Sequence, residues 1–246
     1  MRLMSMDPVG KESLFPPTRW SLVLRANGPH AMAGQVALGE LLKSYWQPLY
    51  VFARRSGLGT EDAQDAVQSF CADVIRVESL KSADREQGRL RSFLLGGFQN
   101  HLRTLHRDAQ RQKRGGGVQV ISLDDAEAAL DMQLVEGESP DRAFDRRWAL
   151  TLLDHVLKRL RAEYVERGRG EVFEVLEPTL VWNQAGMSYD SLGERLGIAP
   201  AAVAQTVKRM RARYRTLLEQ EIGDTVDGPE AMAEERDHLI RVLSGG

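Results

Sequence analysis

Arginine and lysine residues gather in one part of this chain, residues 85–114, in a pattern suited to binding phosphate groups. These 30 residues contain eight Arg or Lys and two acids, whereas the formal charge of the whole chain is −2. If the segment is helical, its basic and apolar residues separate onto two faces. A row of guanidinium groups on one face is the electrostatic pattern expected for a partner with a phosphate backbone. The candidate nucleic-acid-binding residues on this face are Arg89, Asn100, Arg103, Arg107, Arg111 and Arg114.

The opposite face of the same helix is apolar and is expected to pack into a core. Its residues are Leu90, Leu94, Phe98, Leu102, Leu105 and Ala109. A solvated charged helix is an alternative, but it would carry mixed signs, and Asp108 is the one acid in the C-terminal half. A basic amphipathic helix could also bind an anionic membrane or a calmodulin-like partner, but the core needs this apolar face. The pair Gly96 and Gly97 suits either close approach of DNA or tight helix packing.

A second basic segment, residues 188–215, has the spacing of a helix-turn-helix. Leu192 and Leu196 are the inward positions of a short first helix, Gly197 supplies the turn, and Pro200 begins the second helix. The sixteen residues from Pro200 onward contain five Lys or Arg and no acid. An ordinary helical hairpin with a basic surface is the alternative. The residues expected to contact bases or phosphates are Ala201, Gln205, Lys208, Arg209 and Arg213.

The elements that must position these residues all have helical spacing, so the sequence predicts an all-α fold. Residues 60–77 form an amphipathic helix in which Thr60 is the N-cap. Residues 37–57 predict a helix that Pro48 kinks or splits, and residues 140–167 predict a long helix begun by Pro140. The apolar stripe of the 60–77 helix consists of Ala63, Ala66, Val67, Phe70, Val74 and Val77.

Charge and composition divide the chain into two small helical domains and three connecting or terminal segments. Residues 115–140 open with three glycines and hold six acids but no Lys or Arg, which favours an acidic interdomain linker. The five predicted parts are an N-terminal tail (1–14), a helical domain (15–114), the linker (115–140), a helix-turn-helix domain (141–222) and an acidic C-terminal tail (223–246).

Composition argues against several other classes of protein. One cysteine, Cys71, excludes an intramolecular disulfide and fits a reducing compartment. We find no secretory signal and no apolar run of the roughly 18–20 residues that span a bilayer, so we expect a cytoplasmic protein. The five histidines are scattered, and no phosphate-loop or nucleophile motif is present. We therefore expect no enzyme activity, no catalytic residue, no metal and no cofactor.

In their order these segments resemble bacterial RNA polymerase sigma factors of the extracytoplasmic-function (ECF) type, whose two domains are called region 2 and region 4. EDAQDAVQSFCADVIR resembles region 2.2, and GRLRSFLLGGFQNHLRTLHRDAQRQKR resembles regions 2.3–2.4. DRRWALTLLDHVLKRL resembles the first helix of region 4, and SYDSLGERLGIAPAAVAQTVKRMRARYR resembles its helix-turn-helix. The resemblance covers roughly residues 15–114 and 141–221.

The resemblance implies a role in promoter recognition and opening during transcription initiation. The implied partners are promoter DNA and core RNA polymerase, through the clamp and flap of its large subunits, with an anti-sigma factor as a candidate. Asp62, Asp65 and Gln68 would contact the polymerase clamp. The 89–114 helix would bind the promoter element nearest the start site, and the 188–215 segment would bind the distal one. The acidic linker would thread the channel that later holds RNA.

Two departures from the family pattern bear on these expectations. Phe93 stands where many relatives have Trp, and residues 163–187 are longer than the usual link between the region 4 helices. That longer link either packs as core or makes a regulatory contact; its expected core residues are Phe173, Leu176, Leu180 and Trp182. A stand-alone helix-turn-helix regulator is the alternative function, although no heptad seam for a dimer is evident.

Overall fold

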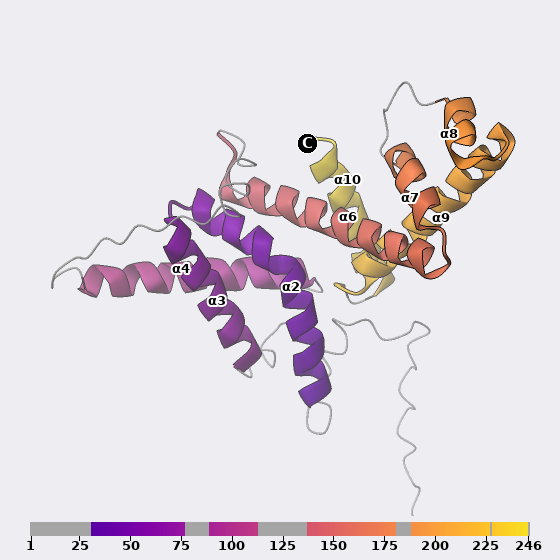
Figure 1. The fold of residues 1–246 in the computed structure, drawn as a ribbon. Coiled ribbons are helices and arrows are strands. Elements are labelled where there is room, and N and C mark those ends of the chain that lie inside the picture. The colour runs from indigo at the N-terminus through magenta and orange to yellow at the C-terminus, as the bar shows by residue number, and fades with distance from the viewer. Residues whose placement is uncertain (1–30, 77–88, 113–136, 181–187, 227, 246) are drawn as a thin grey trace, which may run out of the picture.

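The computed structural model describes residues 31–76, 89–112, 137–180, 188–226 and 228–245 (Figure 1). The described residues form helices without a β-strand, so the predicted all-α fold is confirmed. The helices are α2 (Ala31–Arg55), α3 (Thr60–Arg76), α4 (Leu90–Gln112), α6 (Pro140–Glu166), α7 (Gly170–Leu176), η4 (Glu177–Leu180), α8 (Tyr189–Leu196), α9 (Pro200–Gly223) and α10 (Pro229–Leu243). The predicted N-terminal tail and residues 115–136 of the predicted linker lie outside the described residues.

Pro48 lies inside α2, and the helix is neither ended nor split there. The α2 helix also begins at Ala31, six residues before the predicted start at residue 37. The long helix expected from residue 140 is confirmed as α6, with Pro140 in the first turn and the Ser139 hydroxyl accepting the backbone N–H of Arg142. A proline is tolerated at that position because the first helical N–H groups have no partner within the helix.

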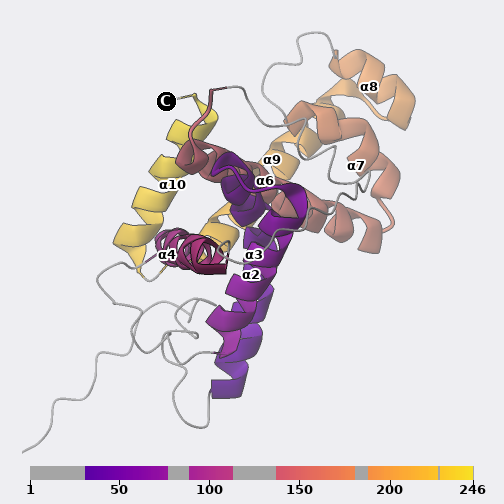
Figure 2. The same ribbon diagram turned by 90° about the vertical axis from the view of Figure 1, so that its left-hand side faces the viewer.

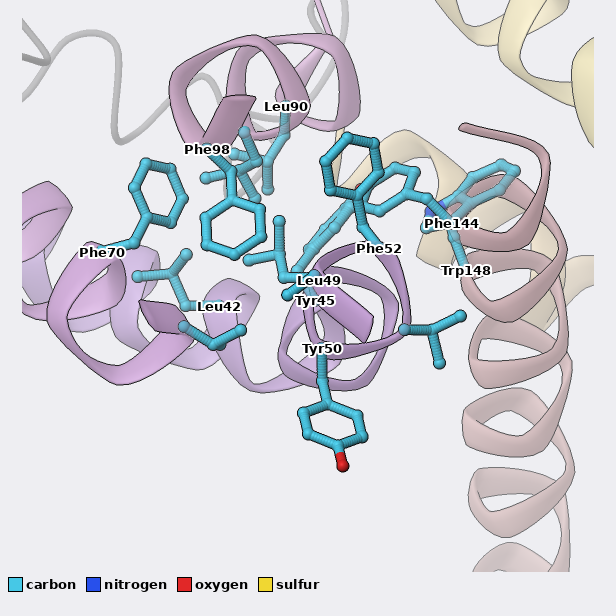
Figure 3. Packing of buried hydrophobic residues seen from close by; sticks show 14 of the residues in the cluster. Leu42, Tyr45, Leu49, Tyr50, Phe52, Phe70, Leu90, Phe98, Phe144 and Trp148 are labelled. Atoms are coloured by element: carbon cyan, nitrogen blue, oxygen red, sulfur yellow. The ribbon is translucent and has the colours of Figure 1, made fainter. Parts of the chain in front are cut away.

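The first hydrophobic core joins α2, α3 and α4 to the first half of α6. Phe98 of α4 lies at its centre, with ring centroids 5.1 Å from Phe70 of α3 and 6.1 Å from Phe52 of α2. Figure 3 shows these rings beside Phe144 and Trp148, which α6 contributes. Burial of such aromatic side chains is a large part of what fixes α4 in the molecule.

The second core lies under the helix-turn-helix and uses the other half of α6. Val156, Leu160 and Tyr164 of α6 pack there with side chains from α7, α8 and α9. The α6 helix therefore contributes to both cores and connects them. Figure 1 shows it running from α2 to α7 and α9. The predicted domain limits stay a prediction, because the segment that would separate the domains is largely outside the described residues.

The predicted acidic tail contains a folded helix, α10. Leu239 of α10 is 2% exposed and belongs to the first core, together with Ile222 at the end of α9. Figure 2 shows α10 beside α4, and the contacts described below join the two helices. The α10 helix thus helps to position the first basic helix.

Candidate nucleic-acid interface

The C-terminal half of α4 exposes the basic face that the sequence predicts. Asn100, Arg103 and Arg107 are exposed. The Arg103 guanidinium donates to the Asn100 side-chain oxygen at 3.0 Å, and the Arg107 guanidinium donates to the Thr104 hydroxyl at 3.0 Å. Both acceptors are uncharged, so these contacts orient the two cations without neutralising them. Arg111 belongs to the last turn of α4, and Arg114 lies outside the described residues.

An open groove lies beside this face, where α4 passes the corner between α2 and α3. Its volume is about 940 Å³. Phe52, Leu58 and Leu102 give the groove an apolar lining, and Arg103 and Arg107 also line it. Apolar side chains next to guanidinium groups suit a ligand that combines flat rings with anionic groups.

The N-terminal end of α4 differs, because its arginines are held by carboxylates. Arg89, a candidate DNA-binding residue, forms an ion pair with Glu234 of α10. Arg91 is 8% exposed, and its guanidinium donates to Glu235 at 3.0 Å and to Asp145 of α6 at 2.8 Å. Burial lowers the pKa of Arg91, but the charge and hydrogen bond of Glu235, together with the charge of Asp145, raise it overall.

Sequence reasoning missed the role of Arg91, although a signal was present. Arg91 lies three and seven residues before Leu94 and Phe98, on the side of α4 that faces the core. An arginine among core positions requires a buried anion as partner. The sequence indicates that Arg91 needs such a partner, but it does not identify Glu235, which is 144 residues away in the chain.

The prediction that the apolar face of α4 is buried is confirmed for the first turns of the helix and is wrong for Leu105. Leu90, Leu94 and Phe98 are fully buried, whereas Leu105 is 39% exposed. The buried α4 residues of the first core all belong to the first half of the helix, and Leu102 beyond them is only partly buried against that core. Ala109 is not among the residues whose side chains the structure describes.

The two glycines inside α4 have different environments. A Cβ at Gly97 would lie 3.3 Å from the ring of Phe70, whereas a Cβ at Gly96 would meet nothing within 4 Å. Gly97 therefore allows α3 and α4 to pack closely. Next to it, His101 is placed against the Ser69 hydroxyl at 3.0 Å, and burial lowers the pKa of His101 despite the nearby Asp73.

The helix-turn-helix is built by the residues that the sequence indicates. The Ser188 hydroxyl caps α8 by accepting the backbone N–H groups of Asp190 and Ser191, each at 3.2 Å. Gly197 has a φ of 66°, a conformation that side chains with a Cβ adopt rarely. A Cβ at Gly193 would lie 2.6 Å from the backbone oxygen of Ile198, so only glycine fits there.

The outward face of α9 carries most of the predicted contact residues. Ala201, Gln205, Lys208 and Arg209 are exposed, and Val203, Val207 and Met210 on the other side are buried. Arg213 is engaged elsewhere, since its guanidinium forms a two-pronged ion pair with Glu163 of α6. The Arg213 hydrogen bond lowers the pKa of Glu163. The N-terminal half of α9 is therefore the accessible part of this candidate surface.

The candidate polymerase-binding residues share one exposed face of α3. Asp62, Asp65 and Gln68 are exposed, while Ala63 and Phe70 on the opposite side are buried. The two carboxylates are three residues apart, close to one helical turn, so both are available to a partner on that side.

The longer link after α6 packs as core where it is described. Phe173 and Leu176 of α7 are fully buried in the second core, and Leu180 packs against it. The Arg211 guanidinium donates to the backbone oxygen of Thr179 at 2.6 Å, which ties the link to α9. Trp182 lies outside the described residues.

None of the helices in the described residues has the length and apolar character that a membrane span requires. No group of three or more His, Cys, Asp or Glu side chains in the same part of the chain could hold a metal ion.

Among the described residues, two helices with exposed basic faces, α4 and α9, thus lie on two connected cores of an all-α fold. The model of the family described as ECF sigma factor matches residues 34–221, which is most of the chain, and the chain belongs to that family. Its role therefore lies in transcription initiation. The α10 helix follows the matched region. No curated protein and no solved structure matches the chain.

Proposed function

We propose that this chain is a sigma factor that binds core RNA polymerase and directs it to promoter DNA, which it helps to open. The observation that carries the proposal is the pair of exposed basic faces, one on α4 and one on α9. Each face belongs to a helix that is anchored in a core, α4 through Leu90, Leu94 and Phe98 and α9 through its buried side, so the helix backbones that carry the cations are in place before DNA arrives. Such preorganisation lowers the ordering cost of binding.

The α4 face is proposed to contact the promoter element nearest the start site. Arg103 and Arg107 would contact phosphates, and Asn100 could pair with adenine. The groove lined by Phe52 and Leu102 would accommodate bases that have left the duplex, because an apolar surface suits the faces of unstacked bases. Arg111 and Arg114 continue the same basic row in the sequence.

The α9 face is proposed to read the distal promoter element as a recognition helix. Its first turns carry the small residue Ala201, which permits close approach to the major groove. Gln205 can pair with adenine, and Lys208 and Arg209 can reach guanine or phosphate. Gln205→Ala is therefore expected to change sequence preference more than overall affinity.

Polymerase binding is assigned to α3. Asp62, Asp65 and Gln68 would contact the clamp, the helix-turn-helix domain would contact the flap, and the acidic linker would lie in the channel that later holds RNA. An anionic segment suits a channel built for phosphates because the charges are complementary. An anti-sigma factor is a further candidate partner.

The test of this proposal is reconstitution with purified core polymerase. The full chain should co-elute with core polymerase and support specific initiation on promoter templates selected from genomic DNA. A triple variant with Asp62→Ala, Asp65→Ala and Gln68→Ala should lose co-elution while retaining its fold. Specific DNA binding without co-elution or initiation would instead identify a stand-alone helix-turn-helix regulator.

The phosphate contacts are tested by salt dependence. Each lost contact should reduce the slope of log affinity against log salt by about 0.9 on duplex DNA and about 0.7 on single strands. Arg103→Ala and Arg107→Ala should each show this loss. Arg161→Ala is the matched control, because Arg161 is exposed but pairs with Glu174 at 2.8 Å. Equal slopes for all three variants and the wild type would contradict phosphate binding by α4.

A further inference from the structure

The α10 helix stands out because it makes charged contacts with a helix proposed to bind DNA. It begins at Pro229, eight residues after the end of the family match. It packs on α6 and α9 and reaches the N-terminal end of α4. The chain therefore adds to its family framework a segment that contacts both halves of that framework.

The segment just before α10 fixes the backbone at the start of α4. The Leu90 N–H donates to the Thr225 carbonyl at 3.0 Å, and Arg89 forms an isolated antiparallel bridge with Val226. Thr225 and Val226 are both buried. These contacts place α10 next to the first turn of α4, where its carboxylates face arginines.

Two neighbouring glutamates of α10 each bind one of those arginines. Glu234 pairs with Arg89 at the surface, and its side chain is 62% exposed. Glu235 is fully buried and accepts from Arg91 at 3.0 Å. A carboxylate and a phosphate bind guanidinium through the same charge-assisted hydrogen bonds. Glu234 therefore holds Arg89 in the way that a DNA phosphate would.

The buried ion pair extends to a third helix. Asp145 of α6 accepts from Arg91 at 2.8 Å, and the His238 ring of α10 lies 3.2 Å from the other Asp145 oxygen. The Arg91 guanidinium also lies over the Trp148 ring, 5.4 Å from its centroid. Moving α10 away would leave buried charges without full compensation, so this cluster holds α4, α6 and α10 together.

The α10 helix is held by both apolar and polar contacts. Leu239 is buried in the first core, and Met232 and Val242 pack against that core partly buried. Two ion pairs, Glu234 with Arg89 and Glu235 with Arg91, add to this apolar contact. Charged groups therefore contribute to the docking of α10, and the Glu234 pair lies where solvent reaches it.

We propose that α10 is an autoinhibitory clamp that occupies the N-terminal end of α4 with Glu234 and Glu235 and is displaced when α4 binds DNA. This proposal about α10 rests on the proposed function of α4. Bound α10 withholds Arg89 from phosphate and keeps α4 joined to α6. A DNA phosphate at Arg89 competes with Glu234, so DNA binding and α10 docking oppose each other.

The test uses the full chain and three charge-removing variants. Glu234→Gln releases Arg89 without disturbing a buried group, Glu235→Gln weakens the buried cluster, and Asp237→Asn is the matched control on an exposed part of the same helix. Binding of fluorescent single-stranded and forked DNA is measured by anisotropy across a salt series. Hydrogen exchange is measured for peptides from the start of α4 and from α10.

The clamp predicts a different result for each variant. Glu234→Gln should bind DNA several-fold more tightly at low salt, with a slope steeper by about 0.7 to 0.9 for the added phosphate contact. Glu235→Gln should also bind more tightly and should exchange faster in α10 and at the start of α4. Asp237→Asn should resemble the wild type in both measurements.

Three outcomes would overturn the autoinhibitory role of α10 while leaving the proposed function of α4 in place. Unchanged exchange in Glu235→Gln would mean that the buried cluster does not hold α10. Faster exchange without tighter DNA binding in either glutamate variant would mean that α10 docking and DNA binding are independent. An equal gain in DNA affinity in Asp237→Asn would mean that the change in net charge alone explains the tighter binding. Failure of the wild type and all variants to bind any DNA would contradict the proposed function of α4 itself, and the clamp with it.

Discussion

Among the predicted contact residues, the exposed cations lie in different halves of the two basic helices, α4 and α9. In α4 the N-terminal arginines are held by carboxylates, and the exposed cations Arg103 and Arg107 lie in the C-terminal half. In α9 the exposed predicted cations Lys208 and Arg209 lie in the N-terminal half, and Arg213 beyond them is paired. A count of basic residues treats all these positions alike. The groups that face each cation separate contact residues from structural ones.

The paired cations of the two helices also differ in burial. The Arg91 and Glu235 side chains are 9% and 0% exposed, whereas Arg213 and Glu163 are 40% and 22% exposed. Water screens the second pair and can solvate either member after the other is removed. Water cannot solvate Glu235 in this way, because the Glu235 side chain is fully buried. Two ion pairs that look similar in a list of contacts should therefore have very different effects on folding.

The largest expected effect comes from breaking the buried pair. Arg91→Ala should lower the free energy of unfolding by about 3–5 kcal/mol, because Glu235 is left buried with its charge uncompensated. Arg213→Ala should cost less than about 1 kcal/mol, as for other solvent-screened pairs. Urea denaturation followed by circular dichroism measures both. Comparable losses in the two variants would show that burial does not distinguish the helices.

Removing the partner charges as well provides a control for the buried pair. Arg91→Ala combined with Glu235→Gln and Asp145→Asn leaves no uncompensated charge, so it should recover much of the stability lost in Arg91→Ala alone. No recovery would attribute the loss to the missing contact between Arg91 and the Trp148 ring rather than to charge.

Two glycine substitutions of intermediate effect distinguish the helix-turn-helix from α4. They compare a glycine in a close backbone contact with one that has open space beside it. Gly193→Ala should destabilise the helix-turn-helix by about 1–3 kcal/mol, because the new Cβ would overlap the Ile198 backbone oxygen. Gly96→Ala in α4 should stabilise the chain by about 0.5–1 kcal/mol, because an exposed helical glycine is replaced without a clash. Thermal unfolding of the two variants should shift the melting temperature in opposite directions. A gain at Gly193 would contradict the close approach of α8 and α9.

Periodicity in the sequence predicted the parts of both helices that depend on local rules. The apolar stripe of α3 from Ala63 to Val74 and the turn at Gly197 follow from spacing and backbone conformation, and they are confirmed, while Val77 of that stripe lies outside the described residues. The exposure of Leu105 was not predicted, because a helical wheel states which face is apolar but not where the neighbouring helices end. How many turns of a helix are buried by its neighbours depends on tertiary packing, which a helical wheel does not describe.

The candidate site was predicted less completely than the fold, for the same reason. Asn100, Arg103, Gln205 and Lys208 are exposed as a DNA contact requires, and their role in binding stays a prediction. Arg89 and Arg213 looked equivalent to them in the sequence but have partners on other helices. Those partners are 145 and 50 residues away, and only the packing of α10 and α6 brings them into reach.

The smallest expected effect is a difference in pH dependence. Burial lowers the pKa of His101 in the contact between α3 and α4, so the unfolded chain takes up this proton at a higher pH than the folded one. The stability of that contact should fall as the pH drops from about 7 through the ordinary histidine pKa of roughly 6.5, and it should level off below the lowered pKa. Raising the pH above 7 should change nothing at this site.

The contact between α9 and α6 should respond only at lower pH. The Arg213 hydrogen bond lowers the pKa of Glu163, so its contribution is present above the ordinary glutamate pKa of about 4.3 and is lost as the pH falls through the lowered value. Hydrogen exchange at pH 7.5 and 5.5, corrected for intrinsic rates, should therefore loosen α4 against α3 and leave α9 unchanged. In His101→Gln the response of α4 should disappear. If it persists there, another titrating group is responsible, and the difference in pH dependence between the two helices does not originate at His101.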